Sequence, residues 1–75
     1  SIEDEIENKF DINELEKEYK QEREKLIDFL SKIIINSRMI VDLENLKKLI
    51  NIKNSIRSNV NIRSVLFNFF EYLKS

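Results

Sequence analysis

The side chains of this sequence that could take part in chemistry are carboxylates and amines, because histidine and cysteine are both absent. Nucleophile–base pairs of the ordinary kind and zinc sites of the Cys/His type require those residues. Glycine is absent as well, so the sequence has no glycine-rich loop that could hold nucleotide phosphates. The residues therefore predict a non-catalytic protein with no cofactor and no small-molecule ligand.

Four carboxylates lie close together near the start of the sequence, at Glu3, Asp4, Glu5 and Glu7. Calcium and magnesium prefer oxygen ligands, so such a cluster is a candidate metal site. Neighbouring positions on a helix point in different directions, however, and such carboxylates usually face water. We expect no metal site here.

The basic residues of the second half are the candidates for contact with nucleic acid: Lys47, Lys48, Lys53, Arg57 and Arg63. They spread around the predicted helices, and no aromatic residue lies between them to stack on bases. A helix-turn-helix would need a polar recognition helix, whereas the last predicted helix is among the most apolar segments. We therefore expect no direct contact with nucleic acid.

Charge is unevenly divided between the two parts of the sequence. Residues 1–24 contain ten acidic and four basic residues, a net charge of −6, and residues 25–75 contain four acidic and nine basic residues, a net charge of +5. In one interpretation the acidic segment lies across the basic helices or stays solvated. In the other, the basic surface meets nucleic acid or an acidic partner.

Hydrophobic residues recur at helical spacing through the first half. Alternating steps of three and four residues, interrupted only at Glu22, connect Ile12, Leu15, Tyr19, Leu26, Phe29 and Ile33. The stripe broadens between Leu26 and Ile34, which predicts core positions. Ile2, Ile6 and Phe10 form an earlier stripe, and the capping pattern that starts at Asp11 leaves two alternatives, a continuous helix or a break near Phe10.

Two further helices are predicted, at residues 43–58 and 62–74. The preceding helix is predicted to stop around Asn36, Ser37 and Arg38. We expect the connection from Met39 to Val41 to turn inward. Asp42 is the predicted N-cap of the helix at residues 43–58. The hinge between the two helices is Asn59-Val60-Asn61. We expect Asn59 to end one helix in the left-handed conformation and Asn61 to cap the next. The apolar positions of the pair are Leu43, Leu46, Leu49, Ile50, Ile52 and Ile56, then Ile62, Val65, Leu66, Phe69, Phe70 and Leu73.

These patterns predict an all-α fold, a small bundle of three to four helices in one domain spanning residues 1–75. The lack of glycine and proline argues against a strand-rich fold. The longest apolar run, at Ile33-Ile34-Ile35, is too short to span a bilayer, and no signal peptide precedes the domain, so we expect a cytoplasmic protein without a membrane partner. A core this small and a first residue other than methionine favour a C-terminal fragment of a larger protein.

Four residues are candidates for a subunit interface: Lys53, Arg57, Phe67 and Phe70. Lys53 and Arg57 fall within the apolar arc of their predicted helix, and Phe67 lies off the stripe of the last helix, as Ile35 does on an earlier one. Aromatic and arginine side chains are the ones that most often dominate binding energy. The alternative is that the Lys53 and Arg57 stems cover the edge of the core while their charges reach water or acidic residues.

In the segment from Leu43 onward, the hinge Asn59-Val60-Asn61 precedes the apolar run Val65-Leu66-Phe67-Asn68-Phe69-Phe70. This segment resembles the C-terminal collar domain of bacterial DNA polymerase III clamp-loader subunits, most of all delta prime. This resemblance implies a role in DNA replication, contacts with other clamp-loader subunits, and an ATPase-type module upstream in the parent protein. The abundance of Ile, Lys and Asn also favours a bacterial source with an AT-rich genome. The alternative is a free-standing helical regulator, of phage or toxin–antitoxin type, that binds a protein or DNA.

Overall fold

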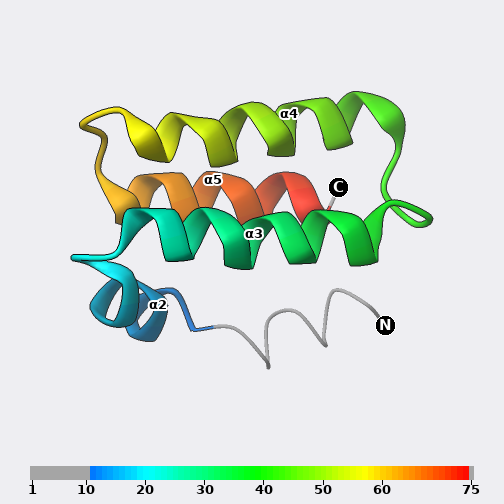
Figure 1. The fold of residues 1–75 in the computed structure, drawn as a ribbon. Coiled ribbons are helices and arrows are strands. Elements are labelled where there is room, and N and C mark those ends of the chain that lie inside the picture. Colours follow the sequence, from blue (N-terminus) through cyan, green and yellow to red (C-terminus); the bar gives the residue numbers. More distant parts are fainter. Residues whose placement is uncertain (1–10, 75) are drawn as a thin grey trace.

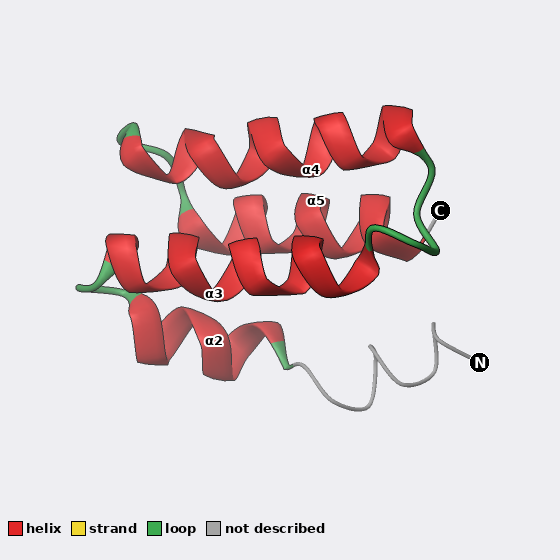
Figure 2. Ribbon diagram, turned by 45° about the vertical axis from the view of Figure 1, so that its right-hand side comes forward, coloured by secondary structure: helices red, strands yellow, loops and turns green. Residues whose placement is uncertain are grey.

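The computed structural model describes residues 11–74, and this part of the chain is a bundle of helices (Figure 1). The elements are α2 (Ile12–Tyr19), α3 (Arg23–Ser37), α4 (Leu43–Asn54), the 3-10 turn η1 (Ser55–Arg57) and α5 (Ile62–Lys74). No strand occurs among these residues, and only short loops join the helices (Figure 2). The predicted all-α bundle is confirmed. The expectations about the first apolar stripe, the acidic cluster and a break near Phe10 fall outside the described residues.

The helices surround one core, and α4 packs against both α3 and α5 and runs antiparallel to both (Figure 1). The short helix α2 packs against α5 and α3. Within the described part of the chain α2 makes no contact with α4, so these two helices lie on opposite sides of the bundle. None of the described helices is long and apolar enough to cross a membrane.

The core gathers the inward positions of all four helices. Its fully buried side chains are Leu26, Leu30, Leu49, Ile56, Leu66 and Phe69. Because each of these positions belongs to a stripe with helical spacing, periodicity alone identified this part of the core. Phe69 and Phe70 add an edge-to-face ring pair with centroids 5.5 Å apart.

The helix starts follow the predicted capping chemistry. The Asp42 carboxylate accepts a hydrogen bond from the Asn45 N–H at 2.8 Å, and the Asn61 side-chain oxygen accepts one from the Ser64 N–H at 3.0 Å. Each bond satisfies a first-turn N–H that has no partner within its helix. The predicted caps at Asp42 and Asn61 are therefore confirmed.

The prediction that Asn59 closes a helix in the left-handed conformation is wrong. No described residue has a positive φ, and the helix ends earlier, in the tight turn η1, where the Ser58 N–H donates to the Ser55 carbonyl at 2.9 Å. The chain is already extended at Ser58. The Ile56 carbonyl, which a left-handed cap could have satisfied, is instead reached by the Arg23 side chain of α3, which also bonds the Val60 carbonyl.

Two further expectations need correction. The stripe predicted from Ile12 to Ile33 does not form one continuous helix, because the chain breaks at residues 20–22, where the Glu22 N–H donates to the Tyr19 carbonyl at 2.9 Å. This break lets α2 turn so that Leu15 joins the core. The connection after α3 does not tuck inward as a whole, because Val41 alone is buried while Met39 and Ile40 are exposed. A sharp turn, in which the Ile40 and Val41 N–H groups share the Ser37 carbonyl, allows only one of the three side chains to point inward.

Candidate protein-interaction surface

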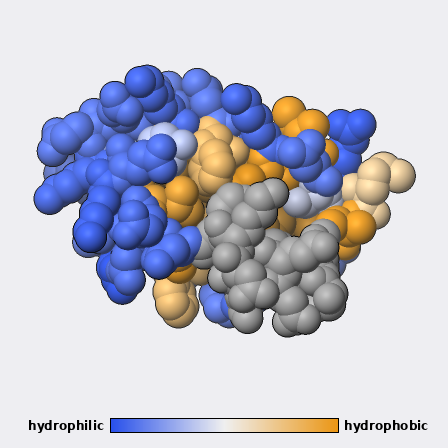
Figure 3. Space-filling model, turned by 90° about the horizontal axis from the view of Figure 1, so that it is seen from below, coloured by the Kyte–Doolittle hydropathy of each residue, from blue (hydrophilic) through white to orange (hydrophobic). Residues whose placement is uncertain are grey.

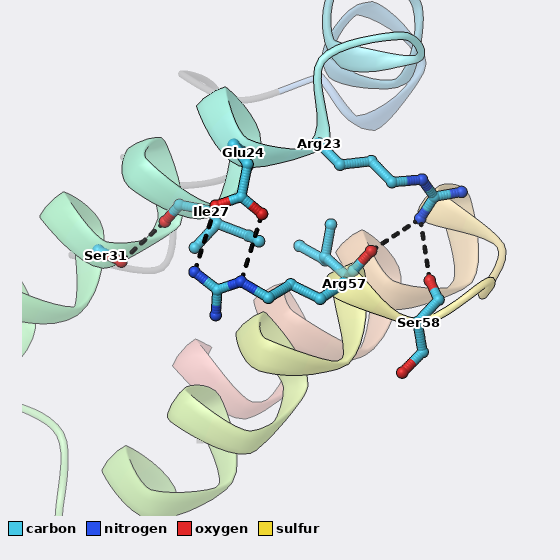
Figure 4. Close-up of polar contacts among 7 residues, drawn as sticks. Arg23, Glu24, Ile27, Ser31, Arg57 and Ser58 are labelled. Atoms are coloured by element: carbon cyan, nitrogen blue, oxygen red, sulfur yellow. Dashed lines mark hydrogen bonds and ion pairs between the residues drawn. The ribbon is translucent and has the colours of Figure 1, made fainter.

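An ion pair between α3 and the end of η1 identifies which side of α3 faces α4. The Arg57 Nε lies 3.2 Å from one Glu24 carboxylate oxygen, and the Arg57 Nη2 donates to the other at 3.3 Å (Figure 4). Both side chains are more than half exposed, so the pair lies at the surface and contributes little to stability. The pair shows that Glu24 and Arg57 lie on sides of the two helices that face each other.

Other residues follow on the same sides because helical positions repeat about every seven residues. On α4, Ile50 and Leu43 precede Arg57 at this spacing, and on α3, Ser31 and Ile35 follow Glu24 along one stripe. The helices are antiparallel, so the end of α3, where Ile35 lies, is near the start of α4, where Leu43 lies. We call the surface formed by these two stripes, together with Met39 and Ile40 at its end, the α3–α4 face.

The α3–α4 face carries most of the large apolar side chains that the described residues expose. Of seven such side chains, five belong to it: Ile35 (55% exposed), Met39 (87%), Ile40 (59%), Leu43 (66%) and Ile50 (41%). Figure 3, a view from below, shows mostly hydrophilic side chains at the end of the molecule that carries α2 and hydrophobic ones toward the opposite end. Single exposed apolar residues are normal, but a group of five on one face is typical of an interaction site.

The other end of the α3–α4 face is charged. The ion pair of Glu24 with Arg57 lies there, and Lys53 is one turn before Arg57 on α4. Lys53 is partly buried and has neither an ion pair nor a hydrogen bond to another described residue. Ser31, between the two ends, donates its hydroxyl proton to the Ile27 carbonyl at 2.7 Å and is satisfied within its own helix (Figure 4). Arg38, seven residues after Ser31, and Lys47, between Leu43 and Ile50, lie on the same stripes, so among the described residues the face combines exposed apolar side chains with several cations.

The structure separates the four residues predicted to form an interface. Lys53 and Arg57 lie on the α3–α4 face. Phe67 is 58% exposed but lies on the α2 side of α5, because Arg63, one turn earlier, donates to Asn13 of α2. Phe70 is 5% exposed and packs in the core, since its position falls within the inward arc of α5. Phe70 is therefore a core residue and not the exposed interface residue that was predicted, and these four side chains do not form one contiguous surface.

The sequence pattern missed the apolar end of the α3–α4 face. Leu43 and Ile50 fit the apolar stripe of α4 and read as core positions, but they lie at the outer edge of that stripe. Leu43, Ile50 and Arg57 are seven residues apart, which places them on one side of the helix. This spacing could have indicated that Leu43 and Ile50 share the exposed side of Arg57. Ile35 was recognised as lying off its stripe, and its exposure confirms that prediction.

A different cluster, of polar side chains, joins α3 to the hinge. The Arg23 guanidinium donates to the Ile56 carbonyl at 3.0 Å and to the Val60 carbonyl at 3.1 Å, with a longer contact of 3.5 Å to Ser58. Arginine is suited to this task because its planar group presents several N–H donors in a rigid arrangement. This cluster holds the hinge against α3 and is structural.

A shallow hollow of about 360 Å³ lies where α2 meets α3. Tyr19 and Phe29 stack there with ring centroids 5.7 Å apart, beside Glu18 and Glu22. Burial, together with those two carboxylates, raises the pKa of the Tyr19 hydroxyl. No group of three or more potential metal ligands is assembled within residues 11–74.

Comparison with protein-family models, curated proteins and solved structures finds no match for this chain. Function must therefore be argued from the residues and their arrangement.

Proposed function

We propose that this chain is a non-catalytic protein-interaction domain, and more specifically the collar domain of a bacterial clamp-loader subunit, cytoplasmic and acting in DNA replication. The observation that carries the first part is the gathering of five exposed apolar side chains on the α3–α4 face of an otherwise well-packed bundle. Water-exposed apolar area of this kind is released from solvent when a partner covers it, which provides the driving force for association.

The second part of the proposal depends on the resemblance of the last two helices to the clamp-loader collar. In that role the domain would join its subunit to others through helix packing, while a separate module of the parent protein would bind nucleotide. The helix pair α4 and α5, joined by a hinge with Asn61 as N-cap, agrees with the segment on which the resemblance rests. The α3–α4 face would then be a surface between subunits.

A free-standing helical regulator is the second candidate. The net charge of +5 in residues 25–75 is the observation in its favour, because a basic surface attracts nucleic acid as well as acidic proteins. On the α3–α4 face, however, apolar side chains outnumber cations, and this balance favours a protein partner.

Association with purified clamp-loader subunits from the same genome tests the proposal. The tagged 75-residue chain should retain at least one of these subunits through size-exclusion chromatography, and it should not shift duplex DNA at physiological salt. If no subunit is retained, the collar assignment fails. If the chain binds duplex DNA with strong salt dependence, the regulator is the better description.

A further inference from the structure

We infer that this chain forms a dimer in which two copies exchange α2, with α2 and α3 of each copy joined into one continuous helix. We call the arrangement of Figure 1 the closed form. In the dimer, α2 of one copy packs on α5 and α3 of the other, where that copy's own α2 packs in the closed form. This inference goes beyond the proposed function and does not depend on the collar assignment. Four features of the described residues lead to it.

The first feature is the composition of the break between α2 and α3. The break consists of Lys20, Gln21 and Glu22, which all favour the helical conformation, and it contains neither glycine nor proline. Lys20 still has helical backbone angles, with φ −50° and ψ −39°, and no described residue has a positive φ. The residue types of the break therefore do not require α2 and α3 to be separate helices.

The second feature is that the apolar stripe continues through the break. Steps of three and four residues connect Tyr19, before the break, to Leu26, after it, with Glu22 between them. If residues 12–37 formed one helix, it would be about 39 Å long, and Glu22 would be the single carboxylate in its stripe. This spacing is typical of one helix that packs against neighbours along its whole length.

The third feature is the start of α3, which has no cap. The other described α-helices are each capped by a side chain, those of Asp11, Asp42 and Asn61. No side chain caps α3, whose N-cap residue is Glu22. Three N–H groups of its first turn consequently have no partner within the helix, those of Arg23, Glu24 and Lys25. In a continuous helix they would donate to the carbonyls four residues earlier, so straightening the break adds backbone hydrogen bonds.

The fourth feature is that few contacts hold α2 in the closed form. This helix has eight residues, and Leu15 is its one buried side chain, with Ile12 and Tyr19 partly buried beside it. Arg63 of α5 lies 3.7 Å from the Glu16 carboxylate, and this ion pair is exposed enough to contribute little. A helix of this length is marginal on its own. The cost of moving α2 is therefore mainly the cost of removing Leu15 from the core.

A second copy of the chain removes that cost. If α2 left α5 within a single copy, Leu15 would enter water and the core beneath it would lose its cover. The α2 of a second copy carries the same side chains, so it restores the contacts of the closed form, and the first copy does the same for the second. This exchange is symmetric and is complete with two copies. The dimer thus keeps the closed-form contacts and adds the hydrogen bonds of the continuous helix.

Sedimentation of the 75-residue chain tests the inference. Refolding from denaturant at about 1 mM protein should give a dimer, and refolding after about hundredfold dilution should give the monomer, because concentration favours exchange. Glu22→Leu replaces the carboxylate in the stripe and should lower the dissociation constant of the dimer by about tenfold or more. A parent chain that remains monomeric up to about 1 mM, or a Glu22→Leu dimer no tighter than that of the parent, would overturn the inference.

Two variants at the start of α3 show whether the dimer requires a continuous helix. Arg23→Pro suits the closed form, because the first N–H of a helix has no partner there and Glu22 is already outside the helical region. In a continuous helix it would remove the bond to Tyr19 and clash with the preceding turn, so it should weaken the dimer by about hundredfold or more. Arg23→Met is the matched control, since it lacks the same hinge bonds but can continue a helix. Equal dimerisation of the two variants would overturn the inference.

Nuclear magnetic resonance of the parent dimer identifies the exchanged element and needs no variant. In dimers of one isotope-labelled and one unlabelled copy, refolded together, the contact between the Tyr19 and Phe29 rings should connect the two copies, whereas in the closed form it lies within one chain. The amide protons of Arg23, Glu24 and Lys25 should exchange slowly in the dimer and rapidly in the monomer. A dimer in which Tyr19 contacts Phe29 of its own chain, or in which these three amides exchange as rapidly as in the monomer, would overturn the inference.

Discussion

Replacing Arg23 by methionine should destabilise the domain by loosening the hinge between α4 and α5. The Arg23 guanidinium donates to two carbonyls at 3.0 and 3.1 Å, those of Ile56 and Val60. Methionine keeps much of the aliphatic stem but removes both bonds. Because these carbonyls are only partly buried, water can replace some of the lost energy, and each bond contributes about 0.5–1.5 kcal/mol. The contact of 3.5 Å to the Ser58 carbonyl is at the limit for a hydrogen bond, so we assign it no contribution to the free energy of unfolding.

The expected loss is therefore about 1–3 kcal/mol in the free energy of unfolding. For a domain of this size a loss of 2 kcal/mol corresponds to a decrease in Tm of about 8–16 °C, which thermal unfolding followed by circular dichroism measures easily. Arg23→Lys should give an intermediate Tm, because one ammonium group cannot reproduce the planar fork of donors. Lys25→Met is the matched control on the same helix, since Lys25 is 71% exposed and pairs only with exposed Glu22. This control should cost less than about 1 kcal/mol.

A Tm for Arg23→Met within about 2 °C of the parent would refute this reasoning, because it corresponds to less than about 0.5 kcal/mol. The hinge would then be held by packing alone. If Arg23→Met and Lys25→Met were equally destabilised, the cause would be helix charge in general rather than the carbonyls of the hinge.

Three further predictions concern stability. Asn61→Ala should lower the free energy of unfolding by about 0.5–2 kcal/mol in urea titrations through loss of the bond to Ser64, and an unchanged midpoint would show that water replaces this cap. Leu49→Ala should lower the free energy of unfolding by about 2–5 kcal/mol in the same titrations, because Leu49 is fully buried. Leu43→Ala, at a position 66% exposed, should lower it by less than about 1 kcal/mol. Equal losses in the two variants would contradict the assigned core. The raised pKa of Tyr19 means that the folded protein holds this proton more tightly than the unfolded chain does, so the corresponding stability is complete below about pH 10 and is lost as pH rises through the folded-state pKa. Tyr19→Phe should flatten the decline of Tm above pH 10, and an identical decline in both proteins would exclude Tyr19 as its source.

Local chemistry predicted the features of the fold that depend on a few neighbouring residues. Asp42 and Asn61 each precede an apolar stripe, and each caps the helix that follows. The helical spacing of the apolar residues predicted that Leu49 and Leu66 are buried, because residues that face the core recur on one side of their helix, and both side chains are fully buried. These predictions needed no knowledge of which helices are neighbours.

Features that depend on contacts between distant residues were not predictable in this way. The break at residues 20–22 allows Leu15 to reach the core. Glu22, the only interruption of the apolar stripe, was a sign of this break in the sequence. How α2 turns after the break depends on where α5 lies, which the sequence does not show. Asn59 tolerates the left-handed conformation, but Arg23 of α3 satisfies the hinge carbonyls and makes that conformation unnecessary.

The candidate site was predicted in part. Lys53 and Arg57 drew attention because charges lie within an apolar arc, and both belong to the α3–α4 face. Phe70 was an interface candidate in the sequence but lies in the core of the structure, since α5 packs against two other helices. Ile50 fits the apolar stripe of α4 in the sequence, but in the structure it is 41% exposed, on the side of α4 marked by the contact between Glu24 and Arg57.

The most direct test of the central claim, that the α3–α4 face binds a partner protein, is nuclear magnetic resonance of the isotope-labelled 75-residue chain during titration with the clamp-loader subunits of the same genome. The account predicts that methyl and amide signals of Ile35, Leu43 and Ile50 shift or broaden first, while the amide and ring signals of Phe67 on the α2 side of α5 do not change. Changes confined to α2 and the Phe67 side of α5, with the signals of Ile35, Leu43 and Ile50 unaffected, would contradict it.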